Sequence, residues 1–223
     1  MQPQEIARRI AEAIVERRLA AGRRLNELEL SRLFGVSRSI VRFALLALHH
    51  DGLVAFEANR GAFVAKPTLD EAHFLFQAIA ANERSAVDVV LDAPALPALA
   101  ALRAVHARQV KARAKQQMGL SEQLAIDFHR EVVALTGNPL LIDAQRRLLL
   151  RYRIVTTVFK TALDYCALED HHAEFIELLA SGSAARLRRL IAATLAARDP
   201  RARQRAGGRR RSGRRAAAVT ADT

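Results

Sequence analysis

The sequence has almost no cysteine and lacks long uninterrupted apolar runs. Only one of its 223 residues is cysteine, Cys166, and none is tryptophan. A single cysteine excludes an intrachain disulfide framework and fits a reducing compartment. The chain has no apolar run of the roughly 18 residues that a membrane helix needs, and its beginning, MQPQEIARRIAEAIVERRL, lacks the apolar block of a secretion signal. We therefore expect a cytoplasmic protein that does not enter a membrane.

Charge is abundant but unevenly distributed. Apolar residues make up 51% of the chain, enough for a buried core, and the formal net charge is +12, which favours a polyanionic partner. Residues 1–67 carry net +4, residues 68–197 carry net +1, and residues 198–223 carry net +7. The excess positive charge therefore lies at the front of the chain and in its tail.

The tail has the composition of a disordered segment. Residues 198–223, RDPRARQRAGGRRRSGRRAAAVTADT, contain nine arginines and almost no large apolar side chains, so they cannot offset the entropy cost of ordering. We expect either a solvated Arg-rich extension or a nonspecific clamp on DNA phosphates.

The front block reads as three helices followed by a hairpin. Isoleucines at 6, 10 and 14 predict a helix over residues 3–20, and LNELELSRLF predicts a short second helix that Gly35 ends. Ser37 is suited to cap a third helix that runs to about residue 50. The segments LVAF and AFVA flank EANRG, which predicts a β-hairpin with a positive φ at Gly61. Residues 1–67 therefore predict a winged helix-turn-helix domain.

The third helix places two arginines where DNA would be read. Arg38 and Arg42 are four residues apart and share one face near the helix N-terminus, which enters the major groove in helix-turn-helix proteins. Arginine binds guanine in a bidentate manner, while Ser37 and Ser39 suit phosphate oxygens. Arg60, at the tip of the hairpin, is placed to reach the minor groove or the backbone. The alternative is an ordinary solvated helix face.

The rest of the ordered chain is predicted to be helical. Lys66-Pro67 marks a boundary, and the sequence from Thr68 to Glu71 has the pattern of a capping box. We expect an all-α domain over residues 68–197, with helices at about 69–91, 96–117, 122–136, 139–165, 168–180 and 183–197.

The front block resembles the DNA-binding domain of the GntR family of bacterial transcription regulators. The similarity lies in LNELELSRLFGVSRSIVRFALLALHHDGLV and NRGAFV, which hold the turn, recognition helix and wing of that family in order. The resemblance implies DNA contacts by Ser37, Arg38, Ser39, Arg42, Arg60 and Gly61. Three positions depart from the family pattern, with Ala21 and Ile40 in place of proline and Phe43 in place of glutamate.

The second block resembles the helical effector domain of the FadR-like (FCD) subfamily. Many such domains bind a divalent metal through one aspartate and three histidines, of which this sequence retains His129 and His172. Ala125 and Thr194 occupy the other two positions, so we expect no bound metal and no cofactor. The two histidines, together with Arg153, are candidates to bind an effector such as an organic acid or acyl metabolite. The alternative for the histidines is a structural role in the interior.

These observations predict a ligand-responsive regulator that is not an enzyme and binds double-stranded DNA at a palindromic operator as a homodimer. Two alternatives remain open at this point. One is a sequence-nonspecific, nucleoid-type DNA-binding protein led by the tail. The other is an enzyme that uses His129 and His172.

Deletion of residues 198–223 removes nine arginines. We expect the deletion to lower affinity for random-sequence DNA and to flatten the dependence of log Kd on log salt, because fewer counterions are released. Discrimination between operator sequences should change little. A salt titration of duplex binding measures both effects, and an unchanged slope would show that the tail does not touch phosphate.

Overall fold

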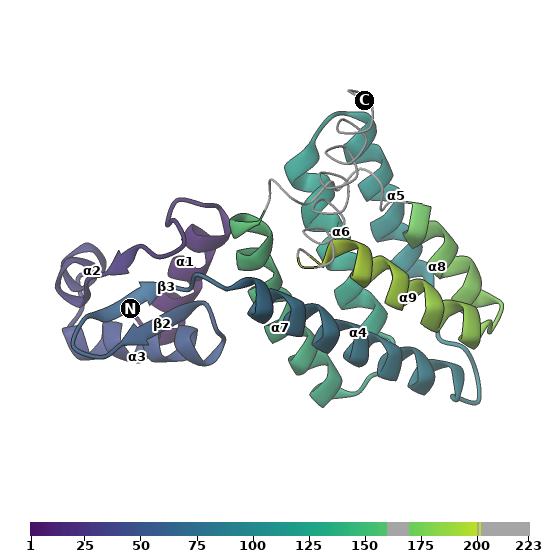
Figure 1. The fold of residues 1–223 in the computed structure, drawn as a ribbon, viewed down its shortest axis with the longest axis horizontal. Coiled ribbons are helices and arrows are strands. Elements are labelled where there is room, and N and C mark those ends of the chain that lie inside the picture. The colour runs from purple at the N-terminus through teal and green to yellow at the C-terminus, as the bar shows by residue number, and fades with distance from the viewer. Residues whose placement is uncertain (160–169, 200, 202–223) are drawn as a thin grey trace, which may run out of the picture. The chain divides into compact units, whose positions relative to one another are not determined.

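The computed structural model describes residues 1–159, 170–199 and 201, which fall into two compact units (Figure 1). The first unit comprises residues 1–68 and 146–159, and the second comprises the remaining described residues. Cys166, the end of the helix expected at 139–165 and the tail from residue 202 lie outside the described residues. Within the described residues, no helix is both long and apolar enough to cross a membrane.

The first unit is a winged helix-turn-helix, as predicted. Its helices are α1 (Pro3–Val15), α2 (Glu27–Phe34) and α3 (Arg38–His50). Its strands are β1 (Arg24–Leu25), β2 (Val54–Glu57) and β3 (Gly61–Val64), which form an antiparallel sheet in the order β1-β3-β2. The hairpin pairs Phe56 with Ala62, and β1 pairs Leu25 with the same residue from the other side. The strand β1 was not expected from the sequence.

Two helix boundaries in this unit differ from the prediction. Helix α1 ends at Val15 instead of near residue 20, because Arg17 adopts a left-handed φ of 63° and the Leu19 amide turns back to donate to the Ala13 carbonyl. Helix α2 begins only at Glu27. The side-chain oxygen of Asn26 accepts the amide hydrogen of Leu28 at 2.9 Å, which caps the helix and leaves Leu25 to the sheet.

The core of the first unit forms where α1 packs against α3. The isoleucines predicted to lie on one face of α1 are all buried, and they meet Val41, Leu45 and Leu48 of α3. The buried cluster consists of Ile6, Ile10, Ile14, Leu25, Val41, Ala44, Leu45, Leu48, Leu53, Val54, Ala62, Val64 and Ile154. Of the apolar residues expected to define α2, Leu28 and Leu33 are exposed and do not join this cluster.

Arginines of helix α7 (Pro139–Val158) cover the C-terminal end of α3. Arg151 donates from Nε to the Asp51 carbonyl at 3.1 Å, and its Nη2 lies 3.4 Å from the His50 carbonyl. The guanidinium of Arg147 lies 2.7 Å from Nδ1 of His50. Carbonyls at the end of a helix carry partial negative charge, so cations at this position are stabilising. This part of α7 thus completes the first unit.

The second unit is a bundle of helices. Its helices are α4 (Leu69–Leu91), α5 (Ala100–Ala114), α6 (Met118–Ala134), the first part of α7, α8 (Asp170–Ala180) and α9 (Ala184–Arg198). Helix α4 packs against α6 and α9, while α5 packs against α6 and α8. The element types agree with the prediction throughout the described residues, and α4 agrees to the residue.

Asp199 and Arg201, which follow α9, contact residues of α4. The carboxylate of Asp199 is buried and lies 2.5 Å from Nδ1 of His73, and Arg201 pairs with Asp70 at 3.1 Å. A truncation that removes most of the Arg-rich tail but keeps these contacts therefore begins at residue 202, four residues later than the composition suggested.

Gly52 offers a test of the junction between α3 and β2. It has a φ of +77°, and a Cβ at this position would meet the guanidinium of Arg151. We expect Gly52→Ala to lower the free energy of unfolding by roughly 1–2 kcal/mol, the usual cost of a left-handed conformation for an L-residue. Urea unfolding followed by circular dichroism measures it. Gly119→Ala is the matched control, because Gly119 is helical with open space around it. Equal losses in both variants would contradict this reading.

Candidate functional site

The helix-turn-helix is defined by short-range capping on both sides of its turn. Gly35 ends α2 in the left-handed region with a φ of 64°, and Ser37 begins α3 by accepting the Ile40 amide hydrogen on its hydroxyl at 3.4 Å. The prediction that Ser37 caps this helix is confirmed. These local interactions fix where the first turn of α3 lies and which side chains it presents.

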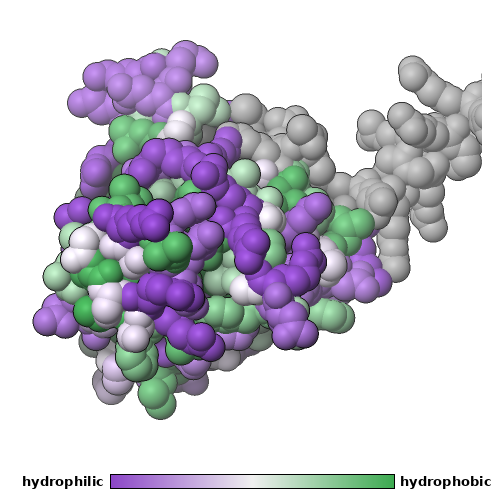
Figure 2. All heavy atoms as spheres, turned by 90° about the vertical axis from the view of Figure 1, so that its left-hand side faces the viewer, coloured by the Kyte–Doolittle hydropathy of each residue, from purple (hydrophilic) through white to green (hydrophobic). Residues whose placement is uncertain are grey.

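The DNA-binding candidates of α3 lie on its solvent side. Because one side of the helix is buried in the core, the side chains of Arg38 and Arg42 are 66% and 67% exposed, and Ser39 is exposed as well. Figure 2 views the molecule from the side on which Figure 1 shows α2 and α3. Polar residues predominate on this face, with apolar residues scattered among them. The structure thus brings Ser37, Arg38, Ser39 and Arg42 together at one accessible helix end.

The carboxylate of Glu27 pairs with both Arg38 and Arg42. Oε2 of Glu27, at the start of α2, lies 3.6 Å from the Arg38 guanidinium, and its Oε1 lies 4.0 Å from that of Arg42. The Glu27 side chain is only 21% exposed, so its position is fixed better than the positions of the arginines. Glu27 is the first glutamate of the sequence LNELEL, residues 25–30, and its contact with the two arginines was not predicted from the sequence.

The wing places the other two candidates in a tight turn. Gly61 has a φ of 93°, as predicted, and Asn59 is also left-handed at 59°. Arg60 forms an ion pair with Glu57, and its guanidinium lies 5.2 Å from the centre of the Phe63 ring. The arginine is exposed, so the turn presents a cation at the tip of the hairpin.

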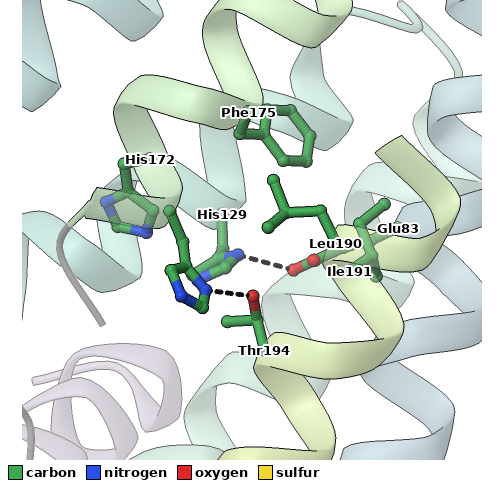
Figure 3. A pocket seen from close by; sticks show the side chains of 8 residues that line it. Glu83, His129, His172, Phe175, Leu190, Ile191 and Thr194 are labelled. Atoms are coloured by element: carbon green, nitrogen blue, oxygen red, sulfur yellow. Dashed lines mark hydrogen bonds and ion pairs between the residues drawn. The ribbon is translucent and has the colours of Figure 1, made fainter. Parts of the chain in front are cut away.

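A pocket in the second unit contains the candidate effector residues. It is lined by Glu83, His129, His171, His172, Phe175, Leu190, Ile191 and Thr194, which come from α4, α6, α8 and α9 (Figure 3). His129 and His172 were predicted to line a common pocket, and both are buried there. Arg153 does not line this pocket and lies in the first unit, so its role in binding an effector stays a prediction.

One wall of the pocket is a buried polar network. Nδ1 of His129 lies 2.9 Å from Oε1 of Glu83, which also accepts a hydrogen bond from Nε2 of Gln145 at 3.0 Å. The side-chain amide of Asn82 donates to Oε1 of Gln145 at 2.9 Å. Glu83 and Gln145 are almost fully buried. A buried carboxylate needs such partners, because it has lost its contact with water.

The remaining histidines also have side-chain partners. Nδ1 of His171 lies 2.6 Å from the Thr194 hydroxyl, and Nδ1 of His172 lies 2.8 Å from Oε1 of Gln109. The His172 ring stacks on Phe128 at 4.0 Å between ring centres. His106 meets the edge of His172, and burial lowers the pKa of His106. The neutral form of His106 is therefore favoured, and its protonation at low pH opposes folding.

The pocket does not fit a tightly bound divalent metal. Thr194 stands where the subfamily has a histidine and is already hydrogen-bonded to His171, while Ala125 provides no carboxylate. The Glu83 and His129 side chains pair with each other instead of converging on one point. Within the described residues, no group of three or more histidine, cysteine, aspartate or glutamate side chains is placed to hold an ion.

Sequence reasoning missed several residues of the pocket. The sequence did not predict the contacts of Gln109 with His172, of Thr194 with His171, or of Gln145 with Glu83. The pairing of Glu83 with His129 was not predicted either. The pocket residues and their partners come from six helices, α4 to α9, and no spacing along the chain encodes such long-range pairs.

Comparison with known proteins identifies the family. Residues 2–64 match the family described as bacterial regulatory proteins of the gntR family, and residues 75–197 match the FCD domain. The chain belongs to the GntR family of transcription regulators, in the group that carries an FCD domain.

Curated relatives are regulators by name. An uncharacterized HTH-type transcriptional regulator in an unstable DNA locus of Streptomyces ambofaciens is 30% identical over 139 residues, which cover 60% of this chain and 56% of that protein. The uncharacterized HTH-type transcriptional regulator YdhC of Bacillus subtilis (strain 168) is 34% identical over 71 residues, 32% of each chain. The chain therefore spans about half of the first relative and a third of the second.

Solved structures agree with this assignment. A GntR transcriptional regulator from Rhodococcus sp. RHA1 is similar with a TM-score of 0.76 and 25% identity, over 86% of this chain and 93% of that chain. E. coli McbR/YncC has a TM-score of 0.69 at 17% identity, over 86% and 92% of the two chains, which shows a shared fold.

The side chains of the pocket predict a low metal content. Protein purified without a metal-affinity tag should carry well under one equivalent of zinc, manganese or nickel, and a chelator should barely move its Tm. Ala125→Asp combined with Thr194→His should create a site, so that added metal raises the Tm of the double variant. Elemental analysis and thermal unfolding measure these outcomes. Stoichiometric metal on the wild-type His129 and His172 would overturn the argument.

Proposed function

We propose that the protein is a ligand-responsive transcription regulator that binds a palindromic operator as a homodimer. The observation that carries the proposal is the pair of exposed arginines on the first two turns of α3, both within 4.0 Å of Glu27. Guanidinium groups at this end of a recognition helix are suited to bidentate contact with guanine. Two copies of the helix on a two-fold axis would read two half-sites, which makes the operator palindromic.

The pocket of the second unit supports a small-molecule effector. Phe175, Leu190 and Ile191 form an apolar side, and the imidazoles of His129 and His172 offer donors for an acidic group. This combination suits an organic acid or an acyl metabolite, which has a charged end and an apolar body. The effector would change the free energy of DNA binding by the difference between its own binding free energies for the DNA-competent form and for the free form.

Gln145 of α7 donates a hydrogen bond to the pocket residue Glu83, so a ligand that displaces Gln145 would disturb the polar wall of the pocket. Membership of a regulator family favours this function over the alternative of a histidine-dependent enzyme. The nucleoid-type alternative predicts equal affinity for a palindromic operator and random DNA.

The test is the loss of specific binding when either arginine is removed. Arg38→Ala and Arg42→Ala should each weaken binding to an operator selected from random duplexes by about 1–3 kcal/mol, while affinity for random DNA falls much less. Arg18→Ala is the matched control, because Arg18 is an exposed arginine of the same unit and pairs with Glu16. Fluorescence anisotropy measures the affinities, and circular dichroism confirms folding. Wild-type operator affinity in both folded variants would refute the assignment.

A further inference from the structure

The exposed side of the recognition helix carries an apolar ridge, formed by Phe43 and Leu46. The side chains of these residues are 64% and 44% exposed. At about 100° per residue, Ser39, Phe43 and Leu46 lie within one narrow sector of α3, directly opposite the buried side formed by Val41, Ala44, Leu45 and Leu48. The Phe43 ring therefore does not pack into the core of the first unit.

The ridge lies beside the charged groups that would meet DNA. Ser39 lies one turn before Phe43 on the same face of α3, and Arg42 flanks that face about 100° around the helix, so a molecule that binds both residues lies beside the phenyl ring. An apolar protein partner seated on the ridge would have to bury the neighbouring guanidinium groups of Arg38 and Arg42, which is costly without matching anions. DNA supplies such anions along both edges of its major groove. The charge around the ridge therefore favours DNA as its occupant.

Only one group on the base edges of the major groove is apolar. Thymine presents its C5-methyl group there, whereas the edges of the other bases present hydrogen-bonding atoms. We propose that Phe43, supported by Leu46, reads the C5-methyl group of a thymine in each half-site of the operator. The proposal rests on sequence-specific DNA binding and adds a base that the arginines do not read. It also assigns a role to Phe43, which occupies the position where the family pattern has glutamate.

The experiment removes the methyl group without changing any hydrogen bond. An operator is first selected from random duplexes with the wild-type chain. Each thymine is then replaced, symmetrically in both half-sites, by deoxyuridine, which lacks only the C5-methyl group. At one thymine per half-site, we expect the replacement to weaken wild-type binding by about fourfold per half-site, the factor for losing one buried methyl-sized group.

Variants assign the effect to the ridge. Phe43→Ala should bind the thymine and deoxyuridine operators equally, whereas Leu33→Ala, which removes an exposed leucine from α2 of the same unit, should keep the wild-type ratio. Arg42→Ala should weaken binding to both operators and leave their ratio unchanged. A new selection with Phe43→Glu should exchange the thymine for cytosine, because a carboxylate accepts the hydrogen of cytosine N4.

The outcomes separate this inference from the proposed function. A selection that enriches no sequence over random DNA would refute both. A clear operator with no thymine sensitive to deoxyuridine, or with the same sensitivity in Phe43→Ala, would overturn the thymine contact and leave specific binding intact. A Phe43→Ala chain that binds DNA normally but changes its mass in sedimentation would show that the ridge contacts another protein surface.

Discussion

Packing between α1 and α3 is the constraint on which the DNA-binding surface depends. Four residues of α3 are buried against the isoleucines of α1, at positions 41, 44, 45 and 48. A helix has a fixed period of 3.6 residues, so burying these four determines the direction of every other side chain on it. Arg38, Arg42 and Phe43 point outward for this reason. The hydrophobic effect thus sets the geometry of recognition, and the polar contacts of Glu27 refine it.

Local signals in the sequence were sufficient for the architecture of the first unit. The turn Gly-Val-Ser, the cap at Ser37 and the glycine of the wing each act within a few residues, and each is found where it was expected. Errors occurred where a distant partner decides the outcome. Leu25 has a helical pattern with its neighbours, but β3 offers it backbone hydrogen bonds, and Asn26 then starts the helix two residues later. The early end of α1 at Val15 has a local cause instead, which is the left-handed conformation of Arg17.

The pocket shows the opposite balance. Counting residues along the chain located His129 and His172 and revealed that two metal ligands are missing. It did not reveal which side chains hydrogen-bond within the pocket, because Glu83, Gln145 and Gln109 come from three different helices. Their hydrogen bonds satisfy groups that would otherwise be buried without partners, and this requirement is visible only once the helices are packed. A network of neutral and acidic side chains thus holds the pocket residues in place.

The position of Ile154 in the core of the first unit affects the order in which that unit folds. It lies in the same apolar cluster as Ile6 and Leu45, although nearly 90 residues separate it from the end of β3. A fragment that stops after the wing therefore leaves part of its interior open to water and lacks the cations that cover the end of α3. During synthesis, residues 1–68 leave the ribosome before residues 146–159, so the interior of this unit closes only after that later segment has followed. Contacts so distant in sequence make loop closure slow, so the assembly of this unit is governed by the chain that follows it.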